Sequence, residues 1–258
     1  MAGPNKSLGQ HWLKDRFILE AIADEAELTP NDVVLEIGPG LGTLTSVLLS
    51  RAKEVIAVEF DVSLAGKLSG QFPGKNLSVH TADILSFNLS KLPTGYKVAA
   101  NVPYYITSKI IQFLSEANNP PSLAVLLVQK EVAERIAATP GSMSMLSVSA
   151  QVFHEVALGP LVQAEYFTPP PKVDSQVVVL RRRAEPLVMP EQQKAFFHLV
   201  KAGFSERRKK LRSSLAGGLG KDKQMIDEML NSAGIESEAR AQELSIEQWL
   251  TLLERSAL

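Results

Sequence analysis

The stretch VVLEIGPGLGTLT, residues 33–45, decides which fold this chain can adopt. Its first part, 33–37, is rich in branched aliphatic residues and is typical of a strand that is buried on both faces. Three glycines at alternate positions follow at once, and a segment with helical spacing comes next, over 43–51. A strand, a glycine turn and a helix in this order indicate a parallel α/β sheet, because the helix is the crossover to the next strand.

The same alternation continues to about residue 128 and predicts the other strands of one sheet. Apolar runs bounded by turns predict strands at 55–60, 77–81, 97–101 and 123–128, and a further one at 175–183. Helices are expected at 62–72 and 106–117, and 144–156 is expected to hold a helix and the start of an edge strand. The predicted fold class is α/β, with a Rossmann-like parallel sheet.

A break at Pro186 and Pro190 separates this sheet from a helical C-terminal part. Beyond it the apolar spacing is helical to the end of the chain. We therefore predict a sheet-containing domain, 1–186, and a small C-terminal all-α domain, 187–258. The expected helix N-caps are Asp222 and Ser245, and the glycines expected to end helices are Gly217, Gly218 and Gly234.

The composition limits the possible classes of function. Of the 258 residues, 45% are hydrophobic and 21% are charged, which is ordinary for a folded globular protein. No apolar run approaches the roughly 20 residues that span a bilayer, and the N-terminus lacks the apolar core of a secretory signal. We therefore expect a cytoplasmic protein with no membrane partner. Because there are no cysteines and the four histidines are scattered, we expect no metal site. The net charge of −1 conceals basic runs at 181–183 and 206–212.

The glycine turn has the spacing of one class of cofactor loop. Glycines stand at Gly38, Gly40 and Gly42, whereas the nicotinamide-binding pattern G-x-G-x-x-G would need glycine in place of Thr43. The G-x-G-x-G spacing, preceded by Glu36, resembles the loop of S-adenosylmethionine-dependent methyltransferases. Open parallel sheets bind such ligands at the carboxyl ends of their strands.

Two carboxylates stand at the next two strand ends. Glu59 closes the second strand, where it can accept hydrogen bonds from both hydroxyls of a ribose. Asp83 follows the third strand, where it can meet the adenine amine of the cofactor. Each carboxylate has an alternative interpretation as a solvated strand end or a helix cap. Ligand-type features at three successive strand ends favour a site for S-adenosyl-L-methionine.

The strand at 97–101 ends in Asn101-Val102-Pro103-Tyr104, which resembles the Asn/Asp-Pro-Pro-Tyr-like motif of enzymes that methylate exocyclic amines of nucleic-acid bases. The amine of adenine is a poor nucleophile because its lone pair is delocalised into the ring. The side-chain oxygen of Asn101 and the backbone carbonyl of Val102 or Pro103 can accept its two hydrogens and aim the lone pair at a methyl donor. Tyr104 offers a face on which the base can stack, worth about 1–3 kcal/mol. The alternative is a turn that only caps the strand.

Together with three further segments, these motifs resemble the bacterial small-subunit (16S) ribosomal RNA adenine dimethyltransferases, the KsgA/RsmA family, nearly from end to end. KSLGQHWL (6–13) is similar to the N-terminal signature of the family, with Trp12 where phenylalanine is usual. YFTPPPKVDSQV (166–177) is similar to its F-x-P-x-P-x-V-x-S stretch, and AGFSERRKKLRSSL (202–215) to its basic helix.

The resemblance implies a role for each matching residue. Catalysis falls to Asn101, Pro103, Tyr104 and Phe167, with Phe167 stacking on the face of the target adenine opposite Tyr104. The implied cofactor contacts are His11, Leu13, Gly38, Gly40, Glu59, Asp83 and Asn101. The implied contacts to rRNA phosphates are Arg207, Arg208, Lys209, Lys210 and Arg212, for which a solvated helix face is the alternative.

The implied activity is transfer of methyl groups from S-adenosyl-L-methionine to the N6 amines of two adjacent adenosines in the 3′-terminal hairpin loop of 16S rRNA. The expected partner is 16S rRNA in a precursor 30S subunit, bound by a monomer. A 23S rRNA adenine methyltransferase of the macrolide-resistance type shares the glycine turn and the strand end Asn101-Val102-Pro103-Tyr104, here called the Asn101 tip. A non-catalytic ribosome-assembly factor could share the scaffold. The basic helical tail and the sequence pI of about 6.5 favour the small-subunit enzyme.

Overall fold

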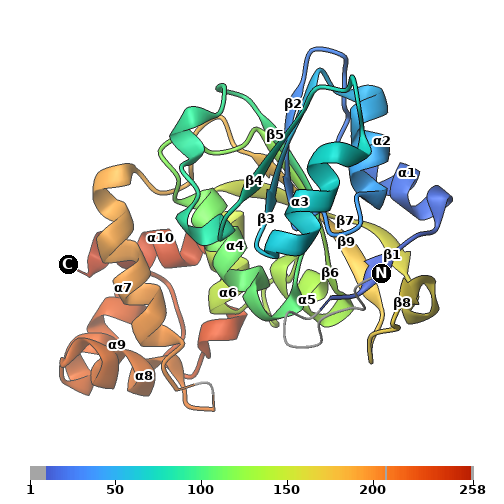
Figure 1. Cartoon of the computed structure of the whole chain (residues 1–258). Coiled ribbons are helices and arrows are strands. Elements are labelled where there is room, and N and C mark those ends of the chain that lie inside the picture. Colours follow the sequence, from blue (N-terminus) through green and yellow to red (C-terminus); the bar gives the residue numbers. More distant parts are fainter. Residues whose placement is uncertain (1–9, 207, 257–258) are drawn as a thin grey trace. The chain divides into compact units, whose positions relative to one another are not determined.

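The computed structural model describes residues 10–206 and 208–256. The chain forms two compact units, one of Met1–Glu134 with Glu155–Arg182 and one of Arg135–His154 with Arg183–Leu258 (Figure 1). Each unit has its own apolar core. Across the described ranges, every helix is too short or too polar to serve as a membrane span.

A seven-stranded sheet with the strand order β4-β3-β2-β5-β6-β9-β7 forms the centre of the first unit. The strands from β4 to β6 are parallel to their neighbours, and β9 pairs with β6 in the antiparallel sense. This sheet confirms the predicted α/β class. The strands are β2 Val33–Ile37, β3 Glu54–Glu59, β4 Leu77–Thr81, β5 Lys97–Asn101, β6 Leu123–Gln129, β7 His154–Val162 and β9 Ser175–Arg182.

The direction of strand addition reverses between β2 and β5. From β2 the chain continues to β3 and β4 on one side, whereas β5 and β6 lie on the other side of β2. Gly38 directly follows β2, and Asn101 is the last residue of β5. The glycine turn and the Asn101 tip therefore lie at neighbouring carboxyl ends, where open α/β sheets bind their ligands.

The strands form where apolar side chains can be buried on both faces of the sheet. Residues 123–128 of β6 are all buried, and full burial of one such large apolar side chain contributes about 1.5–3 kcal/mol. Helices α2 (Thr43–Arg51), α3 (Val62–Gln71) and α4 (Thr107–Ser115) connect parallel strands, as predicted. Two helices lie outside the predicted set: α1 (Arg16–Glu25) precedes β2, and α5 (Lys130–Ile136) follows β6.

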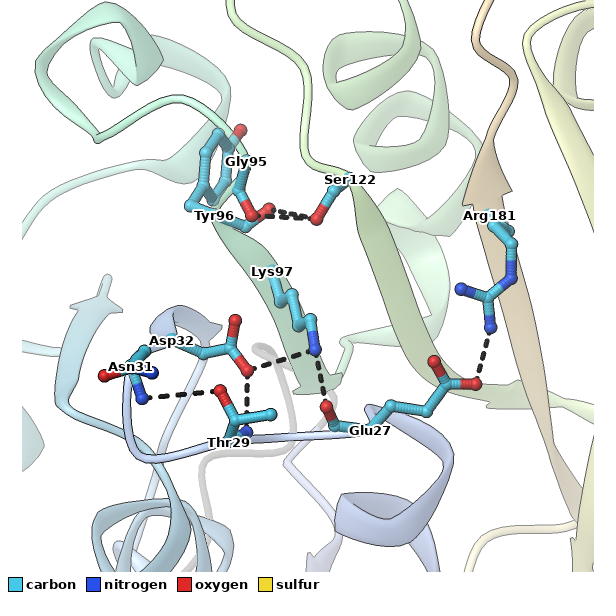
Figure 2. A network of polar contacts seen from close by, with 9 residues as sticks. All are labelled: Glu27, Thr29, Asn31, Asp32, Gly95, Tyr96, Lys97, Ser122 and Arg181. Atoms are coloured by element: carbon cyan, nitrogen blue, oxygen red, sulfur yellow. Dashed lines mark hydrogen bonds and ion pairs between the residues drawn. The ribbon is translucent and has the colours of Figure 1, made fainter.

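A polar network closes the amino-terminal edge of the sheet (Figure 2). The Lys97 ammonium, at the start of β5, donates to Asp32 Oδ2 at 3.1 Å and to the Glu27 carbonyl at 2.5 Å. Arg181, near the end of β9, pairs with the Glu27 carboxylate at 2.6 Å. The network ties β5 and β9 to the loop that leads into β2, at the edge opposite the glycine turn.

A two-stranded sheet joins the N-terminal segment to the proline-rich segment. β1 (Trp12–Leu13) pairs antiparallel with β8 (Phe167–Thr168), with Leu13 opposite Phe167. This pairing brings residues more than 150 positions apart in the sequence into one element. It also fixes where His11, the residue before β1, can lie.

The second unit is a helical assembly around Trp249, whose side chain is 0% exposed. Its helices are α6 Met145–Gln151, α7 Gln193–Gly203, α8 Leu211–Leu219, α9 Lys223–Ser232 and α10 Ile246–Arg255. Val148 and Val152 share this core, so residues 135–154 group with the C-terminal helices, although the predicted boundary at 186 assigns them to the first domain. The roles of domains 1–186 and 187–258 stay predictions.

The helix ends of the second unit correct one prediction. Gly217 and Gly218 do not end a helix: α8 continues to Leu219, and Gly220, with φ of 64°, follows it. A Cβ at Gly218 would lie 2.6 Å from the Cβ of Ala202, so this glycine allows α8 to approach α7 closely. The other expected helix signals are confirmed, with Asp222 and Ser245 as N-caps and Gly234 in the left-handed region after α9.

Candidate active site

A cavity of about 290 Å³ opens at the carboxyl ends of β2, β3 and β5. Its lining includes the glycine turn, the N-terminal segment and the Asn101 tip, all of which belong to the first unit. The volume is close to that of small-molecule sites in proteins. Nowhere in residues 10–206 and 208–256 do three or more His, Asp or Glu side chains gather as a metal site.

The glycine turn forms one wall of this cavity. Gly38, Gly40 and Gly42 all have left-handed φ angles, between 57° and 77°. A Cβ at Gly42 would lie 2.6 Å from Leu68 Cδ1, and one at Gly40 would lie 3.5 Å from the Trp12 ring. All three positions therefore favour glycine for its backbone conformation, and only Gly42 also needs it for want of space, since 3.5 Å at Gly40 is an ordinary contact.

Glu59 joins the end of β3 to the glycine turn. Its Oε2 accepts a hydrogen bond from the Gly40 N–H at 3.0 Å, and its Oε1 accepts one from the Asp61 N–H at 2.9 Å. The side chain is 6% exposed, and burial raises the pKa of the carboxyl. Glu59 lines the cavity, and each oxygen keeps a lone pair for a ligand, so its cofactor contact stays a prediction.

A second buried carboxyl, Glu36, also lines the cavity and had no assigned role in the sequence analysis. It lies inside β2, is 1% exposed, and accepts a hydrogen bond from Thr45 Oγ1 at 2.6 Å. Burial raises its pKa to about 8, and the nearby charge of Glu59 adds to the shift. An acidic residue in the otherwise apolar run VVLEI was the signal that could have identified it.

Asp83 is a helix cap, one of the interpretations of its sequence position, and it also lies at the cavity. Its Oδ1 accepts a hydrogen bond from the Leu85 N–H at 3.0 Å, which caps the 3-10 helix η2 (Ile84–Ser86). The same residue lines the cavity and is exposed. The cap fixes one oxygen of the carboxylate and leaves the other without a partner among the described residues.

The Asn101 tip is held by the N-terminal segment. The Asn101 amide nitrogen Nδ2 donates to the His11 carbonyl at 3.2 Å, and the side-chain oxygen has no hydrogen-bond partner within the described ranges. The Pro103 carbonyl accepts a hydrogen bond from the Ile106 N–H at 3.2 Å, in the turn that starts η4 (Tyr104–Ile106). Of the two backbone acceptors considered, the Val102 carbonyl is the one without a hydrogen-bond donor among the described residues.

Tyr104 connects three segments that are distant in the sequence. Its hydroxyl lies 2.6 Å from Ser175 Oγ, and burial raises its pKa. The His11 ring stacks on its ring with centroids 5.8 Å apart and planes at 18°, while His11 Nδ1 lies 2.7 Å from the Pro169 carbonyl. The motifs singled out in the sequence therefore meet around one tyrosine, and His11 covers one face of its ring.

Comparison with known proteins agrees with this arrangement. The family model described as ribosomal RNA adenine dimethylase matches residues 2–258. The chain belongs to the ribosomal RNA adenine dimethylase family. It is 41% identical to the ribosomal RNA small subunit methyltransferase A of Dehalococcoides mccartyi over 96% of this chain and 86% of that protein. It is also 41% identical to the protein of the same name from Desulfitobacterium hafniense, over 98% of this chain and 92% of that one.

Two solved structures resemble the dimethylase chain over most of its length. The 23S rRNA methyltransferase ErmE superimposes with a TM-score of 0.77 at 34% identity and covers 95% of this chain and 98% of its own. A dimethyladenosine transferase from Plasmodium falciparum gives a TM-score of 0.80 at 29% identity, over 94% and 96% of the two chains. The Rossmann-like methyltransferase fold is thereby established, and with it S-adenosylmethionine as the methyl donor of the family.

One predicted catalytic residue of the dimethylase lies away from the cavity. Phe167 is 2% exposed and packs in the core of the first unit with Leu13, Val162 and Val177. The pairing of β8 with β1 directs its ring inward, because Leu13 lies opposite it. The paired aromatic faces expected from Tyr104 and Phe167 are thus not assembled in this structure, and contact of Phe167 with the target base stays a prediction.

Leu13, one of the predicted cofactor contacts, is also buried, at 2% exposed. It lines the cavity, and its carbonyl accepts a hydrogen bond from Thr43 Oγ1 at 2.8 Å. Because Thr43 begins α2, this bond holds the N-terminal segment over the glycine turn. Residues 6–9 of the N-terminal signature lie outside the described residues.

The basic segment of the dimethylase, residues 208–212 at the start of α8, carries its charge in ion pairs. Lys209 pairs with Glu206 at 2.5 Å, Lys210 pairs with Glu238, and Arg212 pairs with Asp227 at 2.7 Å. Arg208 is exposed and has no ion pair with any described residue. Arg207, the fifth predicted RNA contact, lies outside the described residues, and the RNA-binding role of the segment stays a prediction.

Proposed function

We propose that this protein transfers methyl groups from S-adenosyl-L-methionine to the N6 amines of two adjacent adenosines in the 3′-terminal hairpin loop of 16S rRNA. The small-subunit methyltransferase name of relatives at 41% identity supports this choice of RNA. The meeting of Asn101, Tyr104 and the carboxylates at one cavity supports the chemistry. We further propose that it acts in the cytoplasm, as a monomer, on precursor 30S subunits.

The residues of the cavity fit this cofactor. S-adenosylmethionine supplies a methyl group on a positively charged sulfonium and also carries an ammonium group. Glu36 and Glu59 are buried carboxyls whose pKa values are raised by burial, so a cationic ligand would favour their ionised forms. The glycine turn leaves backbone open to the ligand, and Glu59 and Asp83 keep acceptor positions for ribose hydroxyls and an adenine amine.

The tip residues can prepare the target amine. The side-chain oxygen of Asn101 and the carbonyl of Val102, neither bonded to any residue that the structure describes, are the two acceptors for its hydrogens. Accepting both draws the nitrogen toward a tetrahedral shape and turns its lone pair toward the donor. Holding the amine in line with the methyl group of the donor makes the reaction effectively unimolecular, and this orientation supplies much of the rate enhancement. No strong general base is needed, since the nitrogen becomes acidic only after it has gained the methyl group.

The arrangement at Tyr104 suggests how the base enters. One face of the ring is covered by His11, and the hydroxyl is held by Ser175, so the ring cannot turn freely. A fixed aromatic ring is a suitable platform for the target base on its other face. A loop target suits this site because unpaired bases cost less free energy to flip out of a stack.

The competing function is methylation of 23S rRNA, the activity for which ErmE, 34% identical to this chain, is named. Labelled cofactor offered separately to unmethylated 30S particles and to 23S rRNA distinguishes the two. We expect label in the 30S particles, as dimethyladenosine at two adjacent positions after digestion and mass analysis. Label in 23S rRNA alone would replace the proposed substrate, and no label in either would favour a non-catalytic assembly factor.

A further inference from the structure

Beside the catalytic tip, the cavity is lined by an aromatic side chain and a cation that the methyl transfer itself does not use. Tyr105 and Lys109 both line it, directly after the catalytic tip. Tyr105 is 64% exposed, and Lys109 is also exposed. Lys109 is the sole lysine or arginine among the described lining residues, beside the carboxylates Glu36, Glu59 and Asp83.

These two residues lie close together in the chain, on either side of the junction between η4 and α4. Tyr105 belongs to η4, and Lys109 follows four residues later in the first turn of α4. Both residues line the cavity and both side chains are exposed, so an aromatic ring and an ammonium group stand at its mouth.

Neither side chain has a structural task that the packing reveals. α4 is anchored by Ile110, Ile111 and Leu114, which are buried. Within the part of the chain that the structure describes, the Tyr105 hydroxyl has no hydrogen-bond partner and Lys109 has no ion pair. The neighbouring Tyr104 differs in both respects, because its hydroxyl is bonded to Ser175 and its ring is stacked with His11.

The substrate must cross this mouth. When one nucleotide is flipped into the cavity, the nucleotides on either side of it stay attached through their phosphates and lie at the rim. An aromatic face next to a cation suits such a strand, since bases stack on the ring and the phosphate pairs with the cation. The carboxylates deeper in the cavity would repel a phosphate and suit the cationic cofactor instead.

We propose that Tyr105 and Lys109 form a subsite for the nucleotide next to the one in the cavity. The Tyr105 ring stacks on the neighbouring base, and the Lys109 ammonium contacts the phosphate between the two nucleotides. With two adjacent adenosines as targets, the neighbouring base is the second acceptor, which the subsite keeps at the mouth while the first is methylated. This inference rests on the proposed function.

Binding of a hairpin RNA with the 3′-terminal small-subunit loop tests the stacking contact. One RNA carries both adenosines, and a second has an abasic nucleotide in place of one of them. The wild-type protein should bind the abasic RNA about tenfold more weakly, and Tyr105→Ala should bind the intact RNA about tenfold more weakly. Tyr105→Ala should bind the abasic RNA no more weakly than the wild type does, because the variant and the abasic site remove the same stacking contact. Tyr105→Phe keeps the ring and should bind both RNAs like the wild type. Additive losses would overturn the subsite.

The phosphate contact is tested by the salt dependence of the same binding. Lys109→Gln should lower the magnitude of the salt slope by about 0.7, the share of one contact to a single strand, and Lys109→Arg should keep the slope. An unchanged slope in Lys109→Gln would remove Lys109 from the subsite. Cofactor affinity, measured by calorimetry without RNA, should be the same in all four variants.

The outcomes separate this inference from the proposed function. If the wild-type protein methylates small-subunit particles but the Tyr105 and abasic losses are additive, the subsite is wrong and the function stands. If the wild-type protein neither binds the hairpin RNA nor methylates the particles, both fail together.

Discussion

The cavity and the basic segment at 208–212 hold their charged groups in opposite ways. Glu36 and Glu59 are buried and bonded to fixed donors, Thr45 and the backbone of the glycine turn. Lys209 and Lys210 are more than half exposed and pair with carboxylates that are also exposed. A buried carboxylate costs free energy until a cation arrives, whereas a surface ion pair contributes only about 0–1 kcal/mol. The cavity is thus shaped in advance for one ligand, and the basic segment can exchange its carboxylates for phosphates at small cost.

The largest expected effect is on the rate of methyl transfer, when a residue of the cavity is changed. Asn101→Ala should slow methyl transfer to unmethylated small-subunit particles by about 10²–10³-fold, or roughly 4 kcal/mol at most, because the amine loses a positioned acceptor. The measurement is the single-turnover rate with labelled cofactor. Asn118→Ala removes an exposed amide and should keep the wild-type rate.

Asn101→Asp sharpens the same result. It keeps an acceptor oxygen but loses the N–H that donates to the His11 carbonyl. Two acceptors would then face each other, so the N-terminal segment should loosen and the rate should fall between those of the wild type and Asn101→Ala. A wild-type rate in both variants would show that residue 101 does not position the amine.

The next largest effect is on stability and concerns the packing of the glycine turn. Gly42→Ala should lower the free energy of unfolding by about 3 kcal/mol, since φ is 77° and the new methyl would lie 2.6 Å from Leu68 Cδ1. Urea unfolding measures the change. Gly66→Ala is the matched control, because its methyl meets no atom within 4 Å and the site is in the helix α3. It should stabilise the protein by about 0.5–1 kcal/mol, and equal effects of the two variants would contradict the packing argument.

The buried carboxyl of Glu36 makes stability depend on pH. Its pKa is about 8 in the folded protein against an ordinary value of 4.5. Between these values the folded state holds a proton that the unfolded state lacks, so stability falls as the pH rises, by at most about 1.4 kcal/mol per pH unit. Urea unfolding at pH 5.5 and 7.5, without cofactor, should show a smaller loss in Glu36→Gln. The same loss in both proteins would mean that Glu36 ionises normally.

The smallest effect is expected in the basic segment. Arg208→Gln should weaken RNA binding by roughly fivefold, about 1 kcal/mol, and reduce its salt dependence, because Arg208 has no carboxylate partner among the described residues. Lys210→Gln should cost less, since Lys210 must leave Glu238 before it meets a phosphate. Titrations of small-subunit RNA at several salt concentrations compare the two. Unchanged salt slopes in both would place the segment on a solvated face.

Much of the fold follows from local pattern. The strands at 33–37, 77–81 and 97–101 have the predicted bounds. A run of about five mostly apolar residues between turns is too short for a buried helix and is typical of a strand. The carboxylates and the amide at the strand ends were also identified, since parallel strands bring their carboxyl ends to one edge. The order of the motifs along the chain therefore predicted where the cavity lies.

Contacts between segments that are distant in the sequence could not be predicted from local pattern. The stacking of His11 on Tyr104, the bond of Tyr104 to Ser175 and the packing of Phe167 against Leu13 join residues 71 to 154 positions apart. Gly218 gives the same lesson in the second unit, because glycine after a helical run predicts an end, while its neighbour Ala202 makes it a contact point.

The sequence by itself determined the sheet, the class of cofactor loop and the chemical groups at the Asn101 tip, because each depends on a few residues that follow one another. Only the tertiary structure decided which atoms of those groups stay free, which rings face the cavity and which cations are already paired. Local patterns set the conformation of the backbone, but the free energy of each side-chain contact depends on partners that packing brings from elsewhere in the chain.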